Sequence, residues 1–229
     1  MVAALTIPTL MQKSQERANV SKLLKAYSVI NHAFLSATEE YGPIEDWGVN
    51  TTDTGKKDSN GNSIMDYSTN QLVAARLKEF LQAHYYKDYA VGYTKSLDGR
   101  TIPQLSPLLS ADYTIQLSDG VVLKPGWFAK DCSATGEGIN QSFSGTVCSD
   151  YWVILNPSKH MRLGYDVFEF LLTKRGIIPN NNSNRCNING TSVAPDQQGR
   201  GCTQWVVTNH NMEYLRCNDI FTSGKTKCD

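Results

Sequence analysis

The sequence predicts an α+β protein, with helices in its first third and antiparallel strands after them. Between Pro8 and Gly42-Pro43 lies a stretch without glycine or proline, long enough for a helix of roughly 50 Å. From about residue 110, apolar and polar residues alternate with the period of two that is typical of strands. All 6 cysteines follow, from Cys132 to Cys228. The class is therefore predicted from one long helical segment, several strands and a cysteine-containing second half.

The N-terminal helix is expected to end at Tyr41. Apolar residues recur in it at steps of three and four, which predicts one stripe facing a core; they are Val20, Leu23, Leu24, Tyr27, Ile30, Phe34, Ala37 and Tyr41. An apolar run, Val2 to Met11, and a polar collar at residues 12–17 precede this stripe. Lys13, Glu16 and Arg17 of the collar are expected to lie where the helix leaves a membrane or filament core and meets water. A bilayer span needs about twenty apolar residues, so the run is interpreted as the end of a longer, trimmed segment. The alternatives are a short buried helical turn and an ordinary long core helix with a frayed apolar N-terminus.

Residues 42–70 read as loop, because Thr51 to Ser63 is almost wholly polar. A second helix is expected to start near Asn70, where Ser68, Thr69 or Asn70 could cap it. Its predicted buried face is formed by Val73, Leu77, Phe80, Leu81 and His84, with His84 as a packed histidine. A cluster of tyrosines, expected to pack locally in the core, follows: Tyr85, Tyr86, Tyr89 and Tyr93.

Strands are predicted from Tyr113 to Leu117 and from Val121 to Leu123. Ser118-Asp119-Gly120 lies between them, and Asp-Gly at this place is a strong hairpin signal. Further strands are expected at 151–155 and 166–172, joined by a polar connection over 158–164. Residues 179–201 are rich in Asn, Gly and Pro and read as loop, and a short helix is expected from Cys202.

The cysteines predict disulfides and an oxidising compartment. No C-x-x-C motif and no zinc-finger spacing of cysteine and histidine occurs. The six residues are Cys132, Cys148, Cys186, Cys202, Cys217 and Cys228. They allow fifteen connectivities, and nearest-neighbour pairing, which closes three short loops, is the one we prefer. Buried free thiols in a cytosolic protein and a metal site are the two alternatives.

Charge and motifs argue against several classes of function. The chain carries 22 basic and 22 acidic residues, so there is no net charge to attract a nucleic acid backbone, and nucleic acid is not expected as a partner. No G-x-S-x-G, phosphate-binding loop, G-x-G-x-x-G or H-E-x-x-H motif is present, and the 4 histidines are scattered. We therefore expect a non-enzymatic protein without catalytic or cofactor-binding residues.

One weak metal candidate is a calcium loop. Asp58, Asn60, Asn62 and Asp66 offer oxygen ligands at alternate positions, as calcium loops do. The glycine is one place early for an EF-hand and no glutamate follows at position twelve, so a polar surface turn is the preferred interpretation.

Both ends of the chain resemble type IV pilin-like proteins, the family of pilins and type II secretion pseudopilins. The N-terminal motif is Val2-Ala3-Ala4-Leu5-Thr6-Ile7-Pro8-Thr9-Leu10, followed by the polar collar and Leu24-Lys25-Ala26-Tyr27-Ser28. The C-terminal motifs are Gly164-Tyr165-Asp166-Val167-Phe168-Glu169-Phe170, Gly176-Ile177-Ile178-Pro179, Gly201-Cys202-Thr203-Gln204-Trp205-Val206-Val207 and Asn211-Met212-Glu213-Tyr214-Leu215. The middle of the chain matches weakly.

The sequence departs from the family in two places. The family's basic leader, cleavage-site glycine and early glutamate do not occur, so Met1 is interpreted as an artificial start. Val153-Ile154-Leu155-Asn156-Pro157 replaces a more acidic, glycine-containing turn, which weakens transfer of a family metal site.

The resemblance implies a long helix (residues 1–41) packed on the antiparallel sheet of a globular α+β head (residues 42–229), with disulfide-stapled loops. It implies a precursor that is anchored in the inner membrane through the missing segment. This precursor is cleaved by a prepilin peptidase and is often N-methylated. This subunit then joins other pilin-like subunits in a periplasmic or cell-surface helical filament. Pili, secretion pseudopili and DNA-uptake pili fit this description equally. The alternative is a secreted or tip-located adhesin head that recognises a surface ligand through residues 44–70 and 179–201.

Overall fold

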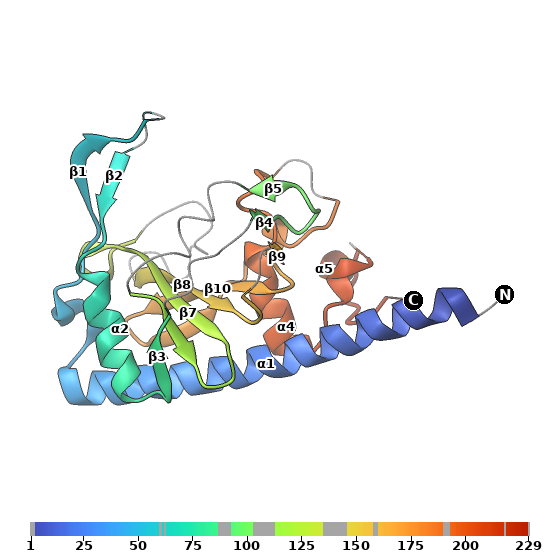
Figure 1. Ribbon diagram of the computed structural model, residues 1–229, viewed down its shortest axis with the longest axis horizontal. Coiled ribbons are helices and arrows are strands. Elements are labelled where there is room, and N and C mark those ends of the chain that lie inside the picture. The colour runs from blue at the N-terminus through green and yellow to red at the C-terminus, as the bar shows by residue number, and fades with distance from the viewer. Residues whose placement is uncertain are drawn as a thin grey trace.

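A 39-residue helix, α1 (Ala3–Tyr41), runs along the whole molecule (Figure 1). The computed structural model describes residues 3–59, 61, 63–86, 93–102, 113–134, 146–157, 160–189, 193–217 and 219–228, with the side chains of α1 described from Leu10 onward. The helix continues through Pro8 and ends where predicted, because Gly42 adopts a φ of 78° and Pro43 cannot continue the hydrogen-bonding pattern.

The predicted apolar stripe of α1 is buried against the head. Leu23, Ile30, Phe34 and Ala37 are at most 1% exposed. The Tyr27 ring stacks on Phe170 of the sheet, with 5.2 Å between ring centroids. The stripe therefore packs one side of α1 on the head.

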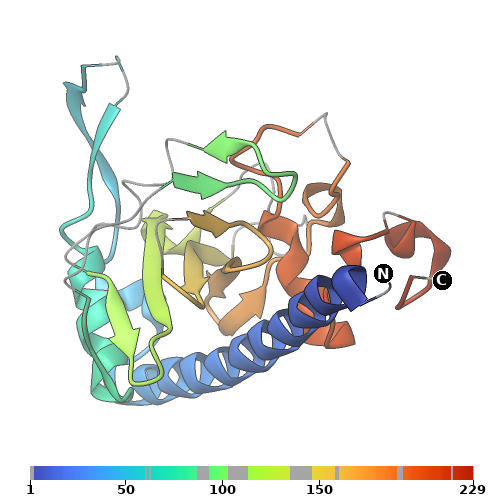
Figure 2. The same ribbon diagram turned by 45° about the vertical axis from the view of Figure 1, so that its right-hand side comes forward.

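A six-stranded antiparallel sheet lies on this side of α1, in the order β11-β10-β8-β7-β6-β3 (Figure 2). Its strands are β3 (Ala83–Tyr85), β6 (Ile115–Leu117), β7 (Val122–Phe128), β8 (Val147–Ile154), β10 (Val167–Thr173) and β11 (Gly176–Pro179). The Asp-Gly hairpin is confirmed: the Leu117 carbonyl accepts from Gly120 N–H, and Gly120 has a φ of 86°. The strands predicted at 151–155 and 166–172 are confirmed as the second half of β8 and as β10.

The second helix, α2 (Asn70–Glu79), starts as predicted and buries Val73 and Leu77, but it stops before His84. The prediction for His84 is wrong, because Ala83–Tyr85 pairs with β6 as an edge strand and leaves His84 exposed. Tyr85 is 40% exposed and therefore does not pack in the core. Tyr89 and the side chain of Tyr93 lie outside the described residues.

Two segments predicted as loops contain strands. A hairpin of β1 (Thr52–Lys57) and β2 (Ser63–Asp66) stands off the head (Figure 1), preceded by the 3-10 turn η1 (Ile44–Trp47). Every residue of β1 is exposed, so no apolar alternation marks it. Within 158–164, β9 (His160–Arg162) pairs with β4 (Tyr93–Lys95), which also pairs with β5 (Thr101–Ile102). This small sheet covers the face of the large sheet that is turned away from α1.

The covered face combines apolar and charged side chains. Trp152, Ile154 and Val167 pack with Met161 and Leu163 in a second apolar cluster. In register with Trp152 lie Lys124 on one side and Glu169 on the other, which are 1% and 4% exposed. The Arg200 guanidinium lies 4.9 Å from the centroid of the Trp152 ring. Charged groups are therefore built into the interior of the head.

Burial controls the protonation of these groups. Desolvation raises the pKa of Glu169 to about 7, although Arg200 Nη1 lies 3.2 Å from its Oε1 and Asn180 donates to its Oε2 at 2.7 Å. Desolvation also lowers the pKa of Lys124 to about 7, which the nearby Asp150 carboxylate partly offsets.

Disulfides close the second half of the head with the predicted nearest-neighbour pairing. The bonds join Cys132 to Cys148, Cys186 to Cys202 and Cys217 to Cys228. The short helix predicted from Cys202 is confirmed as α4 (Thr203–Asn209). The other short helical elements are η2 (Lys130–Cys132), η4 (Ser183–Arg185), η5 (Arg200–Cys202), η6 (Glu213–Leu215) and α5 (Ile220–Ser223).

Removing the Cys186–Cys202 bond should destabilise the head. Both cysteines are fully buried and close a loop of 16 residues, which corresponds to about 3 kcal/mol in the chain-entropy description. We expect the double variant Cys186→Ala/Cys202→Ala to unfold at lower urea concentration than the wild type. Non-reducing peptide mapping of the wild type should recover the three pairs, and an unchanged urea midpoint would contradict the prediction.

Glu169 should make stability fall with rising pH. Its folded pKa of about 7 lies above the value of an unfolded glutamate, so the contribution of the protonated group is complete below about pH 4.3 and is lost as pH rises through about 7. We expect the free energy of unfolding to fall by at most about 4 kcal/mol across this window.

The variant Glu169→Gln should flatten this pH dependence in urea titrations. A smaller slope should remain, because burial also raises the pKa of Asp166 to about 6. An identical slope in wild type and Glu169→Gln would show that Glu169 does not titrate in this range.

Candidate assembly interface

The first turns of α1 project beyond the head and form an N-terminal extension, Ala3 to Met11 (Figure 1). Every described side chain from Leu10 to Gln15 is exposed, and Glu16 is the first to be buried. Leu10 and Met11 are 66% and 68% exposed. Because Leu10 and Met11 are adjacent, they leave apolar surface that contact with another molecule would remove from water.

The side of α1 turned away from the sheet forms a continuous outward stripe. Its residues recur at steps of four and three, and all are exposed: Ser14, Ala18, Ser21, Lys25, Ser28, His32, Leu35 and Glu39. Half of them are serine or alanine, and small side chains allow a second helix to approach closely. Since α1 buries its other side on the head, this stripe remains available to a neighbouring molecule.

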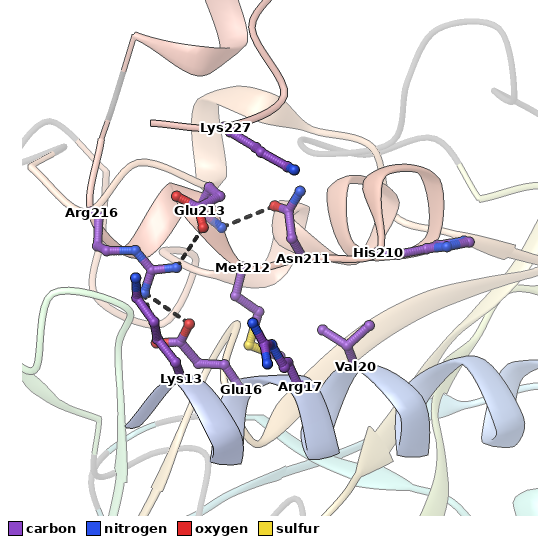
Figure 3. Close-up of a pocket in the computed structure, with 10 residues that line it drawn as sticks. All are labelled: Lys13, Glu16, Arg17, Val20, His210, Asn211, Met212, Glu213, Arg216 and Lys227. Carbon is purple, nitrogen blue, oxygen red and sulfur yellow. Dashed lines mark hydrogen bonds and ion pairs between the residues drawn. The ribbon is translucent and has the colours of Figure 1, made fainter. Parts of the chain in front are cut away.

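A junction of charged side chains fastens the base of the N-terminal extension to the C-terminal segment (Figure 3). Arg216 Nη1 donates to both carboxylate oxygens of Glu16 at 2.9 and 2.8 Å, and Arg216 Nη2 donates to Glu213 at 2.8 Å. Gln12 donates to Glu16 as well. The bonds between Arg216 and Glu16 join residues 200 positions apart in sequence.

The junction shifts the protonation of Glu213 and Arg216 toward their charged forms. The hydrogen bond from Arg216 lowers the pKa of Glu213, and the backbone N–H of Cys228 and the charge of Lys13 lower it further. The bond to Glu213 raises the pKa of Arg216, and the bonds to Glu16 add to this. The ion pair of Arg216 with Glu213 consequently persists over the physiological pH range.

A cavity of about 340 Å³ opens between α1 and the C-terminal segment at this junction. Figure 3 shows the side chains that line it: Lys13, Glu16, Arg17, Val20, His210, Asn211, Met212, Glu213, Arg216 and Lys227. Four of them are permanently cationic and two are carboxylates, and both carboxylates are bound by Arg216. The lining therefore has a surplus of positive charge.

The structure revises the predicted polar collar. Lys13 and Arg17 are exposed as expected, but the prediction that Glu16 meets water is wrong, because Glu16 is 4% exposed. Sequence reasoning missed Arg216 altogether. No periodicity links residues so far apart, and only the fold brings Arg216 to Glu16.

The calcium candidate is not assembled by the described residues. Asn60 and Asn62 lie outside them, while Asp58 is exposed and the Asp66 carboxylate accepts the backbone N–H of Ser68. That hydrogen bond lowers the pKa of Asp66. Among the described residues, no group of three or more His, Cys, Asp or Glu side chains is placed to hold a metal ion.

Within the described part of the chain, no helix combines the length and the apolar character needed to cross a bilayer. The three disulfides are typical of proteins in an oxidising compartment outside the cytoplasm.

Comparison with known proteins assigns a family. A family model described as "Family of unknown function (DUF6613)" matches residues 9–218, so the chain belongs to this family. No curated protein and no solved structure matches the chain.

Arg216→Ala should loosen the C-terminal segment from α1. The substitution leaves the buried Glu16 carboxylate without its bidentate partner, and we expect a loss of about 2 kcal/mol in the free energy of unfolding. Hydrogen exchange should accelerate over residues 210–228. The exposed pair of Lys25 and Asp119 offers a control, because Lys25→Ala should cost less than about 1 kcal/mol. Equal effects of the two variants would refute a special role for the junction.

Proposed function

We propose that this member of the DUF6613 family is a non-enzymatic structural subunit of a pilin-like filament. In this proposal, copies of α1 pack side by side along the filament axis and the heads lie around them. The observation that carries the proposal is the N-terminal extension, which projects from the head with exposed apolar side chains at Leu10 and Met11.

The extension has little to stabilise it in a single molecule. Short isolated helices are marginal in water, and most helical stability in proteins comes from packing an apolar face. Contact with neighbouring copies would bury Leu10 and Met11 and supply this packing. Burying each such side chain stabilises by roughly 1.5–3 kcal/mol, so repetition along a filament makes the contact strong.

The two sides of α1 support a division of roles. The buried stripe binds the helix to its own sheet, as the stacking of Tyr27 on Phe170 illustrates. The outward stripe carries Ser14, Ala18 and Ser21, whose small side chains permit close contact with another helix. A subunit built this way can join neighbours without rearranging its own core.

The resemblance at both ends of the chain supports the rest of the proposal. It suggests a precursor anchored in the inner membrane by a segment upstream of Val2, trimmed by a prepilin peptidase and assembled outside the cytoplasm. The disulfides agree with such a location, since they form in oxidising compartments.

A second candidate function is ligand binding by the head, as in a tip-located adhesin. The observation that favours it is the hairpin β1–β2, which projects from the head and exposes every residue of β1. Such a hairpin could reach a surface ligand, whereas the N-terminal extension would then serve only as an anchor.

Substitution of the exposed apolar residues tests the filament proposal. The full-length gene is expressed with its prepilin peptidase and assembly ATPase, cells are sheared, and the sheared fraction is blotted. We expect Leu10→Asp/Met11→Asp to reduce the filament fraction about ten-fold or more, because each loses a contact worth roughly 1.5–3 kcal/mol. The thermal unfolding of the head should not change.

Ile64→Asp is the matched control, since Ile64 is 41% exposed but lies on the hairpin far from α1. It should leave the filament fraction unchanged. Substitution of the glycine expected at the upstream cleavage point should abolish the fraction. Free protein in the medium that depends on neither the glycine nor Leu10 would favour the secreted binding protein instead.

A further inference from the structure

We infer that successive copies of this chain dock head to tail through oppositely charged ends of the head. The basic end comprises Lys13, Arg17 and Lys227 at the cavity beside α1. The acidic end comprises Glu39, Glu40 and Asp46, where α1 finishes. This inference deepens the proposed function and rests on it, because it names the contact that sets the order of subunits along a filament.

The basic end has cations that form no ion pair or hydrogen bond with another described residue of the same molecule. Within the cavity, Arg216 neutralises both Glu16 and Glu213. Lys13, Arg17 and Lys227 are exposed, and none makes an ion pair or hydrogen bond with another described residue. Lys13 acts on the junction only through its charge, which lowers the pKa of Glu213. An acidic partner from outside would therefore meet three available cations.

The carboxylates of the acidic end are unfavourable for the isolated helix. Glu39 and Glu40 occupy the last turn of α1, which contains no basic residue, although the C-terminal end of a helix favours cations. Both are exposed, as is Asp46 in η1. A cation from a neighbouring copy would relieve this unfavourable arrangement.

Two of the cations near the acidic end already have partners. Arg76 lies over the rings of Tyr41 and Trp47, at 4.7 and 4.8 Å from their centroids. Lys174 pairs with Glu45 at 3.9 Å. Glu39, Glu40 and Asp46 make no ion pair with another described residue.

The two ends cannot meet within one molecule. Lys13 and Glu39 lie on the same helix, and 26 residues at 1.5 Å each separate them by about 39 Å. Contact between different surface patches of identical subunits is heterologous and continues as an open filament unless it closes to a ring. In such a stack, the N-terminal extension of one copy runs beside the head of the next, where Leu10 and Met11 become covered.

Charge reversal with rescue tests this contact in the sheared-filament assay. We expect Lys13→Glu/Arg17→Glu and Glu39→Lys/Glu40→Lys each to reduce the filament fraction about ten-fold, because like charges then face each other. The quadruple variant restores opposite signs at every contact and should recover the fraction to within about two-fold of wild type. Lys56→Glu on the exposed hairpin is the control and should have no effect.

Zero-length carbodiimide cross-linking identifies the partner directly. In mixtures of ¹⁴N- and ¹⁵N-labelled chain, Lys13 or Lys227 should cross-link to Glu39 or Glu40 of a different molecule. The cross-link should appear in filaments and in the concentrated chain at low salt, and it should weaken at about 1 M salt, where charges are screened.

The outcomes separate this inference from the proposed function. Failure of the wild type to enter filaments refutes the proposed function, and the cross-link in the concentrated chain then decides the docking contact alone. Filaments without the cross-link, or without rescue by the quadruple variant, overturn the head-to-tail contact. A different outcome would assign the basic end to a membrane surface instead. In that outcome, only the basic-end variant loses co-sedimentation with anionic phospholipid vesicles, and the acidic-end variant still assembles fully.

Discussion

The burial of one side of α1 on the six-stranded sheet is the constraint on which the rest of the structure depends. Leu23, Ile30 and Phe34 are removed from water by the sheet, and the strands in turn present Phe168, Phe170 and Leu172 to the helix. The opposite face of the large sheet must also be shielded from water, and the small sheet of β4, β5 and β9 covers it. Because α1 is longer than the sheet is wide, its first turns extend beyond the head. The same packing that stabilises the head thus creates the N-terminal extension.

Charged groups fix the parts that apolar packing leaves loose. Arg216 joins the C-terminal segment to α1 through Glu16 and Glu213, and the Cys217–Cys228 bond closes this segment on itself. On the far face of the sheet, Glu169 pairs with Arg200, next to the Cys186–Cys202 bond. Buried pairs seldom add much net stability, since desolvation opposes their attraction, but breaking one leaves an unpaired charge and is costly. They therefore define which arrangement of the segments is tolerated.

The proposed function and the proposed docking contact use different parts of α1. In the proposed assembly, apolar side chains of the N-terminal extension would provide affinity, since burial of apolar surface is the main driving force of association. Charges at the two ends of the head would provide direction and register, because pairs at the rim of an interface contribute more to specificity than to affinity. A long helix connects the two regions rigidly. In this proposal, α1 contributes both to the affinity between subunits and to their order along the filament.

The sequence by itself determined those features that depend on local pattern. The stripe from Val20 to Tyr41, the Asp-Gly hairpin at 118–120 and the start of α2 at Asn70 follow from periodicity and turn chemistry, and short loops favoured the observed cysteine pairs. The tertiary structure alone decided what depends on distant partners. His84 became a strand residue because β6 offered it a pairing edge, and the hairpin β1–β2 formed from exposed residues that carry no apolar signal. Of the candidate interface, the apolar run and the collar were visible in the sequence. The burial of Glu16 was not, because its partner Arg216 lies 200 residues away and only the folded chain brings the two together.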